Sequence, residues 1–165
     1  MSGRSAGRGG RGVSAPAQIV LVRHGFEPDG LALLALLLNG VDISNWPGGL
    51  VACFPRAGAV NGTLVLAEGD INNTFKRYLE RPVTLRIEGD FAEAIEGEGL
   101  DADLMREYMA AWNDRNAYAS SHVGWGMNQA ARWESLIAYD KRDTNGVEAR
   151  AFGGNFLYST GANPF

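Results

Sequence analysis

The chain has 165 residues and a net charge of −4, with 45% hydrophobic residues, 21% charged residues and a single cysteine, Cys53. This composition is typical of a globular domain that buries a core, and it excludes a disulfide framework, a thiolate metal cluster and a low-hydrophobicity disordered chain. The longest apolar run, residues 31–38, is shorter than the roughly 20 residues that cross a bilayer, and the lone cysteine favours a reducing, cytoplasmic compartment.

The first 17 residues differ from the rest in charge. They contain Arg4, Arg8 and Arg11 and no acidic residue, so the remainder of the chain is strongly acidic. Because an acidic body repels phosphate backbones, we expect no nucleic-acid partner, and we expect no membrane partner. Residues 1–17 are expected to form a disordered Gly/Arg leader, since no apolar periodicity offsets the loss of backbone entropy. An RNA-binding arginine-glycine tail is the alternative.

The stretch after the leader mixes short apolar runs with turn residues. Residues 19–22 predict a strand, residues 27–30 a turn, and residues 31–38 a buried helix. Loop-forming residues at 45–49 precede a second predicted strand at 50–54. This order of elements indicates mixed α and β structure.

The middle third has the strongest β pattern. A short β-prone run covers residues 63–66, and residues 82–88 alternate apolar and polar side chains. Gly89 and Asp90 can supply the positive φ of a tight turn, after which residues 91–95 would return antiparallel. The pattern predicts a β-hairpin.

The last third begins with a predicted helix at residues 101–112. Asp101 and Asp103 lie in its first turn, where the helix dipole favours negative charge. One apolar stripe along this helix is expected in the core, and it contains Leu104, Met105, Tyr108, Met109 and Trp112.

Further strands and a helix follow. We expect a strand at residues 117–123, a turn at 124–126, a helix at 129–139 with Asn128 as its N-cap, and a closing strand at 152–158. The elements together predict an α/β or α+β fold with a mixed, largely antiparallel sheet.

Only two histidines are present, and each is a possible metal ligand. His122 ends a predicted strand beside Gly124 and Gly126, whose small size lets a ligand approach, so it is the candidate ligand. The alternatives are a neutral histidine packed in a loop for His122 and an ordinary turn or surface histidine for His24. Neither histidine belongs to an H-E-x-x-H or H-x-D motif, and one histidine does not make a metal site.

Other side chains are weaker candidates. Ser159 and Thr160 can hydrogen-bond a substrate, although hydroxyls at such positions more often cap the backbone. Trp125 is a candidate pocket wall, with simple packing as the alternative. No dinucleotide-binding, Walker or nucleophile-elbow motif occurs, which argues against nucleotide binding and serine hydrolysis. The remaining carboxylates are more typical of solvated charges or caps than of ligands, and they are Asp70, Glu134, Asp140, Asp143 and Glu148.

Several stretches resemble a known enzyme family. The most specific is the octapeptide at 121–128, followed by Ala-Arg-Trp at 131–133; weaker stretches lie at 69–72, 95–102 and 148–161. In these residues the chain resembles the carboxy-terminal half of the 2,5-dihydroxypyridine 5,6-dioxygenases and their relatives in the M29 aminopeptidase-like superfamily. The resemblance covers residues 41–163, and residues 1–40 match poorly.

The resemblance implies a mononuclear Fe(II) held by two histidines and one aspartate, with His122 as the first ligand. In the family the other two ligands form an H-x-D motif downstream of the Ser-Thr-Gly turn, and Phe165 precedes any such motif here. The resemblance therefore implies that residues 18–165 are a partial catalytic α/β domain, truncated at its C-terminus and inactive alone.

The implied reaction is the cleavage of an aromatic ring by O₂ between carbons 5 and 6 of 2,5-dihydroxypyridine, a step of nicotinate degradation. It implies that Ser159 binds substrate, that Trp125 bounds the pocket and that the complete enzyme is a homo-oligomer. Two alternatives stay open. One is an M29-type metallo-aminopeptidase, which the low histidine count weakens, and the other is a non-catalytic interaction module.

Overall fold

The structure, a computed structural model, describes residues 20–23, 43–45 and 48–161. Four features expected from the sequence lie outside these residues, namely the leader at 1–17, the turn at 27–30, the helix at 31–38 and His24. Within the described part of the chain, no helix is long and apolar enough to span a membrane.

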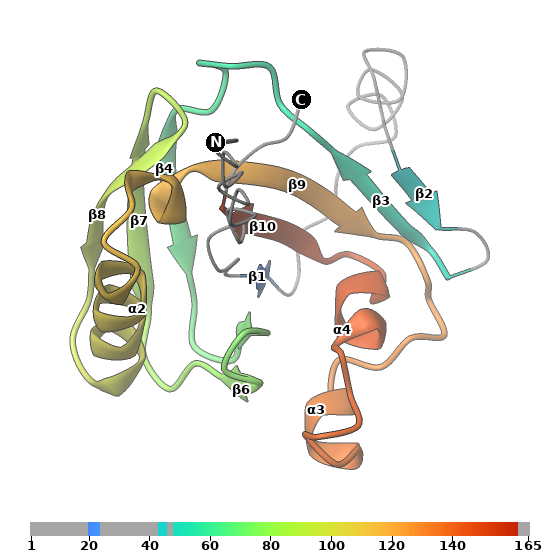
Figure 1. The fold of residues 1–165 in the computed structure, drawn as a ribbon. Helices are drawn as coiled ribbons and strands as arrows, with labels where there is room; N and C mark the ends of the chain where they lie inside the picture. Colours follow the sequence, from blue (N-terminus) through green and yellow to red (C-terminus); the bar gives the residue numbers. More distant parts are fainter. Residues whose placement is uncertain (1–19, 24–42, 46–47, 162–165) are drawn as a thin grey trace, which may run out of the picture.

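Strands dominate the fold and form two sheets (Figure 1). The seven-stranded sheet has the order β2-β3-β9-β10-β1-β5-β6, and the three-stranded sheet has the order β4-β7-β8. Every pairing between these strands is antiparallel, which confirms the predicted mixed, largely antiparallel fold. The strands of the larger sheet are β1 Val20–Arg23, β2 Ile43–Asn45, β3 Leu50–Cys53, β5 Ile71–Asn72, β6 Arg77–Tyr78, β9 Ser120–Gly126 and β10 Phe156–Thr160.

The smaller sheet contains β4 (Gly62–Leu66), β7 (Val83–Glu88) and β8 (Phe91–Glu96). Along β7 buried and more exposed positions alternate, because successive side chains of a strand point to opposite faces. Gly89 and Asp90 both have positive φ, 53° and 74°, and form the tight turn between β7 and β8. The predicted hairpin is confirmed.

Helix α2 (Leu100–Ala111) packs against β8 and contributes Met105 and Met109 to the core. One expectation about it is wrong and another is confirmed. Trp112 is 41% exposed because it follows the end of the helix, where its ring contacts Tyr108 rather than the sheet. Asp101 and Asp103 lie in the first turn as predicted, and Asp101 is also buried and forms an ion pair with Arg77 at 2.9 Å.

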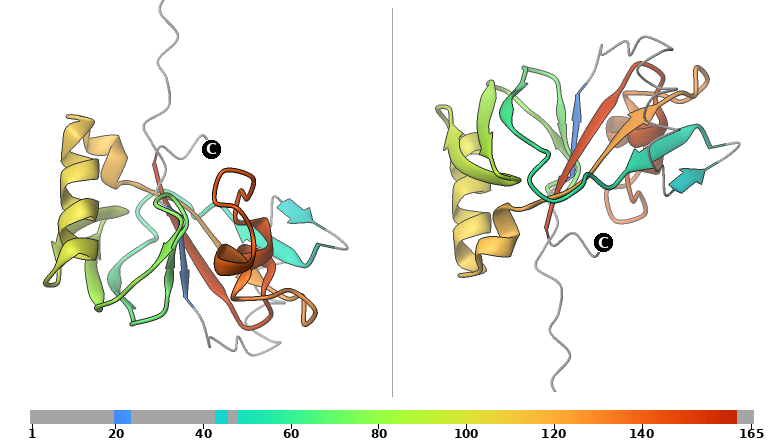
Figure 2. Two further views of the ribbon diagram at one scale, coloured as in Figure 1. Left: turned by 90° about the horizontal axis from the view of Figure 1, so that it is seen from below. Right: turned by 90° about the horizontal axis from the view of Figure 1, so that it is seen from above.

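Two clusters of buried apolar side chains lie on opposite faces of β10. The larger cluster joins Tyr158 to the three-stranded sheet and α2. The smaller joins Leu157 to Ile71, Leu136 and Ala149. Leu136 and Ala149 belong to the short helices α3 (Ser135–Ala138) and α4 (Val147–Ala151), which lie on the other side of the molecule from α2 (Figures 1 and 2). Both faces of β10 are therefore covered.

The structure around β9 differs from the prediction at both ends of the strand. The expected strand at 117–123 starts later, because Arg115–Tyr118 form a 3₁₀ turn whose N-cap is the side chain of Asp114. The expected turn at 124–126 is wrong, since these residues continue β9 and pair with both β3 and β10. Tertiary pairing thus overrides the local turn signal of two glycines.

The segment between β9 and β10 is less helical than expected. Asn128 accepts a hydrogen bond from the amide of Ala130 as predicted for a cap, but only Ser135–Ala138 of the expected helix at 129–139 is helical. The closing strand starts at Phe156 rather than at residue 152, since residues 152–155 form a turn with Gly154 at φ 86°.

Candidate functional site

The candidate site lies where β9 and β10 run side by side. In their antiparallel register, His122 of β9 is directly opposite Ser159 of β10. Side chains of directly opposed residues lie on the same face of the sheet and about 5 Å apart at Cβ. The fold therefore brings together two residues that are 37 positions apart in the sequence and that the sequence predicted as ligand and substrate contact. A register shift follows Ser159, where Thr160 pairs with Ser120 and one residue of β9 is bulged.

Beyond His122, the same face of β9 carries two glycines and is covered closely by the backbone of neighbouring elements. Gly124 and Gly126 occupy the next two positions on that face, because alternate residues of a strand share a face. A Cβ added at Gly126 would lie 2.0 Å from the carbonyl oxygen of Phe152, the residue that ends α4. A Cβ at Gly124 would lie 2.6 Å from the carbonyl oxygen of Val51. Only glycine lets the neighbouring backbone approach this closely.

The electrostatic surroundings keep the His122 imidazole neutral. Burial lowers the pKa of His122, and the positive charge of Arg150 lowers it further. The Phe54 ring lies 5.5 Å from the imidazole, between ring centroids, and contributes to the apolar surroundings. A neutral imidazole is the form that binds a metal ion.

Ser159 is fully buried, with no exposed surface. Among the described residues, its hydroxyl has no hydrogen-bond partner. A buried hydroxyl without a partner costs about 1–3 kcal/mol, so its presence needs an explanation. A bound group that exchanges a hydrogen bond with Ser159 would supply one.

Trp125 lies on the other face of β9 from His122. It is directly opposite Phe156 in the register, and the two rings are 5.7 Å apart between centroids. The indole Nε1 is buried and has no hydrogen-bond partner in the described part of the chain. The structure therefore groups His122 with Ser159 and places Trp125 apart from both, so its role as a pocket wall stays a prediction.

The carboxylates considered as ligands have local roles. Asp70 accepts a hydrogen bond from the amide of Ala67, Glu134 pairs with Arg132 and Asp140 with Arg142. Glu148 accepts a hydrogen bond from the amide of Arg132, and Asp143 is exposed. Within residues 20–23, 43–45 and 48–161, no three His, Cys, Asp or Glu side chains lie close enough together to hold a metal ion. Among the candidate ligands in the described residues, His122 is therefore the one that could supply a single ligand to a metal ion.

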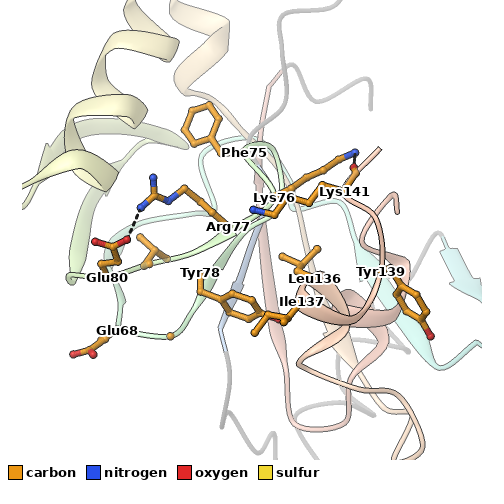
Figure 3. A pocket seen from close by; sticks show the side chains of 12 residues that line it. Glu68, Phe75, Lys76, Arg77, Tyr78, Glu80, Leu136, Ile137, Tyr139 and Lys141 are labelled. Carbon is orange, nitrogen blue, oxygen red and sulfur yellow. Dashed lines mark hydrogen bonds and ion pairs between the residues drawn. The ribbon is translucent and has the colours of Figure 1, made fainter. Parts of the chain in front are cut away.

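A separate hollow of about 930 Å³ lies between residues 68–80 and α3 (Figure 3). The Tyr78 hydroxyl bridges its two walls by donating a hydrogen bond to the carbonyl oxygen of Trp133 at 2.8 Å. Lys76 reaches across the hollow to the carbonyl oxygen of Lys141. Neither His122 nor Ser159 lines this hollow, so it is distinct from the candidate site.

The sequence patterns did not indicate two neighbours of His122, Arg150 and Phe54. Arg150 acts on its pKa from α4, a five-residue helix that no periodicity predicted because it is little longer than one turn. Phe54 approaches from the end of β3, and no local pattern indicates which strands become neighbours in space. Both depend on tertiary arrangement.

Comparison with known proteins points to one family. The family model for NicX, 2,5-dihydroxypyridine 5,6-dioxygenase, matches residues 40–165. A 2,5-dihydroxypyridine 5,6-dioxygenase of Pseudomonas putida is 43% identical over 119 residues, which cover 72% of this chain and 34% of that protein. The solved structure of 2,5-dihydroxypyridine dioxygenase from Pseudomonas putida KT2440 superposes with a TM-score of 0.68 and the same coverage.

The match includes β9 and β10, and therefore both His122 and Ser159. The chain spans about a third of the length of the relatives that it matches. Residues 1–39 lie outside the family match, in agreement with the poor resemblance expected there. With three quarters of its residues matched by the family model, the chain belongs to the 2,5-dihydroxypyridine 5,6-dioxygenase family.

Proposed function

We propose that this chain contributes one metal ligand and one substrate contact to a mononuclear Fe(II) dioxygenase that opens the ring of 2,5-dihydroxypyridine or a close analogue. The observation that carries the proposal is the direct opposition of His122 and Ser159, whose buried hydroxyl has no hydrogen-bond partner among the described residues. Family membership supports the reaction class. We also propose a reducing, cytoplasmic compartment, because Cys53 is the sole cysteine. The complete enzyme is proposed to be a homo-oligomer.

His122 would hold the iron through its imidazole. The residue suits this role because burial and the charge of Arg150 favour the neutral form of its imidazole. The iron, when bound, supplies the centre at which an aromatic diol and O₂ meet. Two further ligands are required for tight binding, and they would come from the part of the enzyme that this chain does not match.

Ser159 would orient the substrate. Its hydroxyl can both donate and accept a hydrogen bond, so it suits a ring hydroxyl or its deprotonated form. Because Ser159 is buried between two strands, its position is fixed before substrate binds. A bound substrate would also remove the cost of the unpartnered hydroxyl.

A chimera tests the proposal. The 119 matching residues of this chain would replace their counterparts in the Pseudomonas putida relative, and iron content and O₂ uptake with 2,5-dihydroxypyridine would be measured. We expect the chimera to bind iron and consume O₂, His122→Ala to lose both, and Ser159→Ala to keep iron while kcat/KM falls about tenfold or more.

Ser120→Ala is the matched control, since Ser120 is also a buried serine next to β10 but bonds to Tyr158. It should leave both iron content and turnover nearly unchanged. Iron binding and turnover that survive His122→Ala in the chimera would disprove the proposed role of His122.

A further inference from the structure

The strand between β10 and β5 comes from outside the part of the chain that matches the family. β1, at Val20–Arg23, lies between these two strands, whereas both neighbours belong to residues 40–165. We infer that the gap between β10 and β5 is a strand-acceptor site, and that residues 20–23 of the same chain fill it by antiparallel strand addition.

The pairing of β1 is extensive on one side and short on the other. All four of its residues pair with β10, from Val20 opposite Ser159 to Arg23 opposite Phe156. Two of them, Leu21 and Val22, also pair with β5. The occupant therefore hydrogen-bonds in both directions, as an interior strand does.

The gap would be costly to leave empty. The strands that border it are fully buried at Ile71 and Ser159 and almost fully buried at Leu157. Without an occupant, the backbone groups of β10 and β5 that face β1 would lose their hydrogen-bond partners, and each one that water does not reach would cost about 1–3 kcal/mol. Within the described part of the sheet, β1 is also the only strand that joins the β5–β6 pair to the other strands.

The sequence of β1 suits an interior position. Val-Leu-Val-Arg is rich in β-branched and apolar residues, as is typical of strands covered on both faces. The 19 residues from 24 to 42 connect β1 to β2, and a chain of that length can extend roughly 60 Å. The connection would therefore allow β1 to enter its own gap or that of a second copy. Tethering favours its own gap, because a covalent link between the strand and the rest of the chain gives an effective concentration on the order of millimolar.

The acceptor site has a consequence for Ser159. This residue pairs with His122 on one side and with Val20 on the other, so β1 makes its strand an interior one. An empty gap would turn β10 into an edge strand at Ser159, and edge strands exchange and shift more readily. Residues 20–23 therefore act as a positioning segment for the candidate site.

Disulfide cross-linking tests both the register and the origin of the occupant. In a Cys53→Ala background, Arg23→Cys with Phe156→Cys places two thiols at directly paired positions. The matched control, Val20→Cys with Phe156→Cys, is three residues out of register, roughly 10 Å along the strand. With oxidised glutathione, we expect rapid intramolecular cross-linking of the first pair and at least tenfold slower cross-linking of the second. Equal rates for both pairs, or cross-linked dimers in place of monomers, would overturn the inference.

Hydrogen exchange of the full-length chain gives a second, independent measurement. Val22→Pro removes a backbone donor from the middle of β1, and the control Ala15→Pro adds a proline to the same N-terminal segment outside the strand. We expect the amides of residues 157–159 and 71–72 to exchange at least tenfold faster in Val22→Pro and unchanged in Ala15→Pro. Unchanged exchange in Val22→Pro would show that residues 20–23 do not fill the gap.

Discussion

The two regions that meet at β10 bury different kinds of side chain. The region of the three-stranded sheet and α2 is almost entirely apolar, and its one buried charge, Asp101, is paired. The region of β9, β10 and the short helices holds most of the buried polar residues, namely Ser120, Ser121, Ser135, Asn155, Ser159 and Thr160. Several of the buried polar atoms of this second region have no hydrogen-bond partner among the described residues, including those of Ser135 and Ser159.

The two regions therefore have different roles: the first stabilises the fold, and the second contains the candidate site. Apolar burial contributes roughly 25 cal/mol per Å² and needs no partner, so the first region stabilises the fold. A buried polar group without a partner destabilises the fold, and native proteins tolerate it mainly where it has a function. The candidate site lies in the second region, where His122 and Ser159 face each other.

The largest expected effect is on the apolar region. Leu85→Ala removes a fully buried side chain from the centre of β7 and should lower the free energy of unfolding by about 3–4 kcal/mol, through lost burial and the cavity left behind. Urea denaturation followed by circular dichroism measures it. The control Leu100→Ala affects a side chain that is 57% exposed and should cost less than about 1 kcal/mol. Equal losses for the two variants would mean that the apolar region is not the main source of stability.

A smaller loss is expected at the one buried charge of that region. Asp101→Ala leaves Arg77 without its buried partner and leaves the amide of Glu80 without its acceptor, so we expect a loss of about 2–3 kcal/mol. Glu93→Ala breaks the exposed ion pair with Arg115 and should change stability little. The same denaturation experiment compares the two. Similar values for both variants would show that burial of Asp101 does not strengthen its pairing.

The free energy of unfolding at alkaline pH depends on Tyr158, which lies on β10 where the two regions meet. Burial raises the pKa of Tyr158 to about 12, against the partial opposing effect of its hydrogen bond with Ser120. The folded state therefore keeps a proton that the unfolded chain releases near pH 10. This contribution, about 2 kcal/mol, is complete below pH 10 and is lost as the pH rises towards 12. In denaturation between pH 9 and 12, Tyr158→Phe should lack this part of the pH dependence. Identical pH profiles for the two proteins would contradict the raised pKa.

The smallest expected changes in the free energy of unfolding come from substitutions of two buried serines in the second region. Ser120→Ala should cost about 1 kcal/mol, because it leaves the buried Tyr158 hydroxyl without its partner at 2.8 Å. Ser159→Ala should be neutral or stabilise the isolated chain by up to about 0.5 kcal/mol, since it removes a hydroxyl that has no partner in the described residues. Thermal unfolding of both variants resolves the difference. A loss at Ser159 as large as that at Ser120 would show that its hydroxyl is already satisfied.

The sequence predicted the first region better than the second, for a physical reason. The β7–β8 hairpin and α2 are specified locally, by alternation, by Gly89 and Asp90, and by apolar spacing along the helix. In the second region, Gly124 and Gly126 resemble turn residues, yet they lie in a strand because neighbouring backbones require their small size. Contacts distant in sequence decide such positions.

The candidate site shows the same division. His122 could be selected because it is one of only two histidines and precedes two glycines, and Ser159 because the family resemblance includes it. Their pairing across the sheet could not be predicted, because it depends on the register of β9 against β10 and on the shift after Ser159. Trp125 is a candidate pocket wall because glycines flank it, but local sequence does not show that a strand sends residues 122 and 125 to opposite faces.

The close packing of backbone against the two glycines of β9 also limits how this family member can change over evolutionary time. A side chain at Gly126 would meet the backbone that ends α4, and one at Gly124 would meet the backbone of β3, neither of which can move aside as a flexible side chain can. Single substitutions at these two positions are therefore not tolerated without movement of the neighbouring backbone. Changes around His122 would have to come from residues that neighbouring elements direct towards this face, while the strand itself keeps its two glycines.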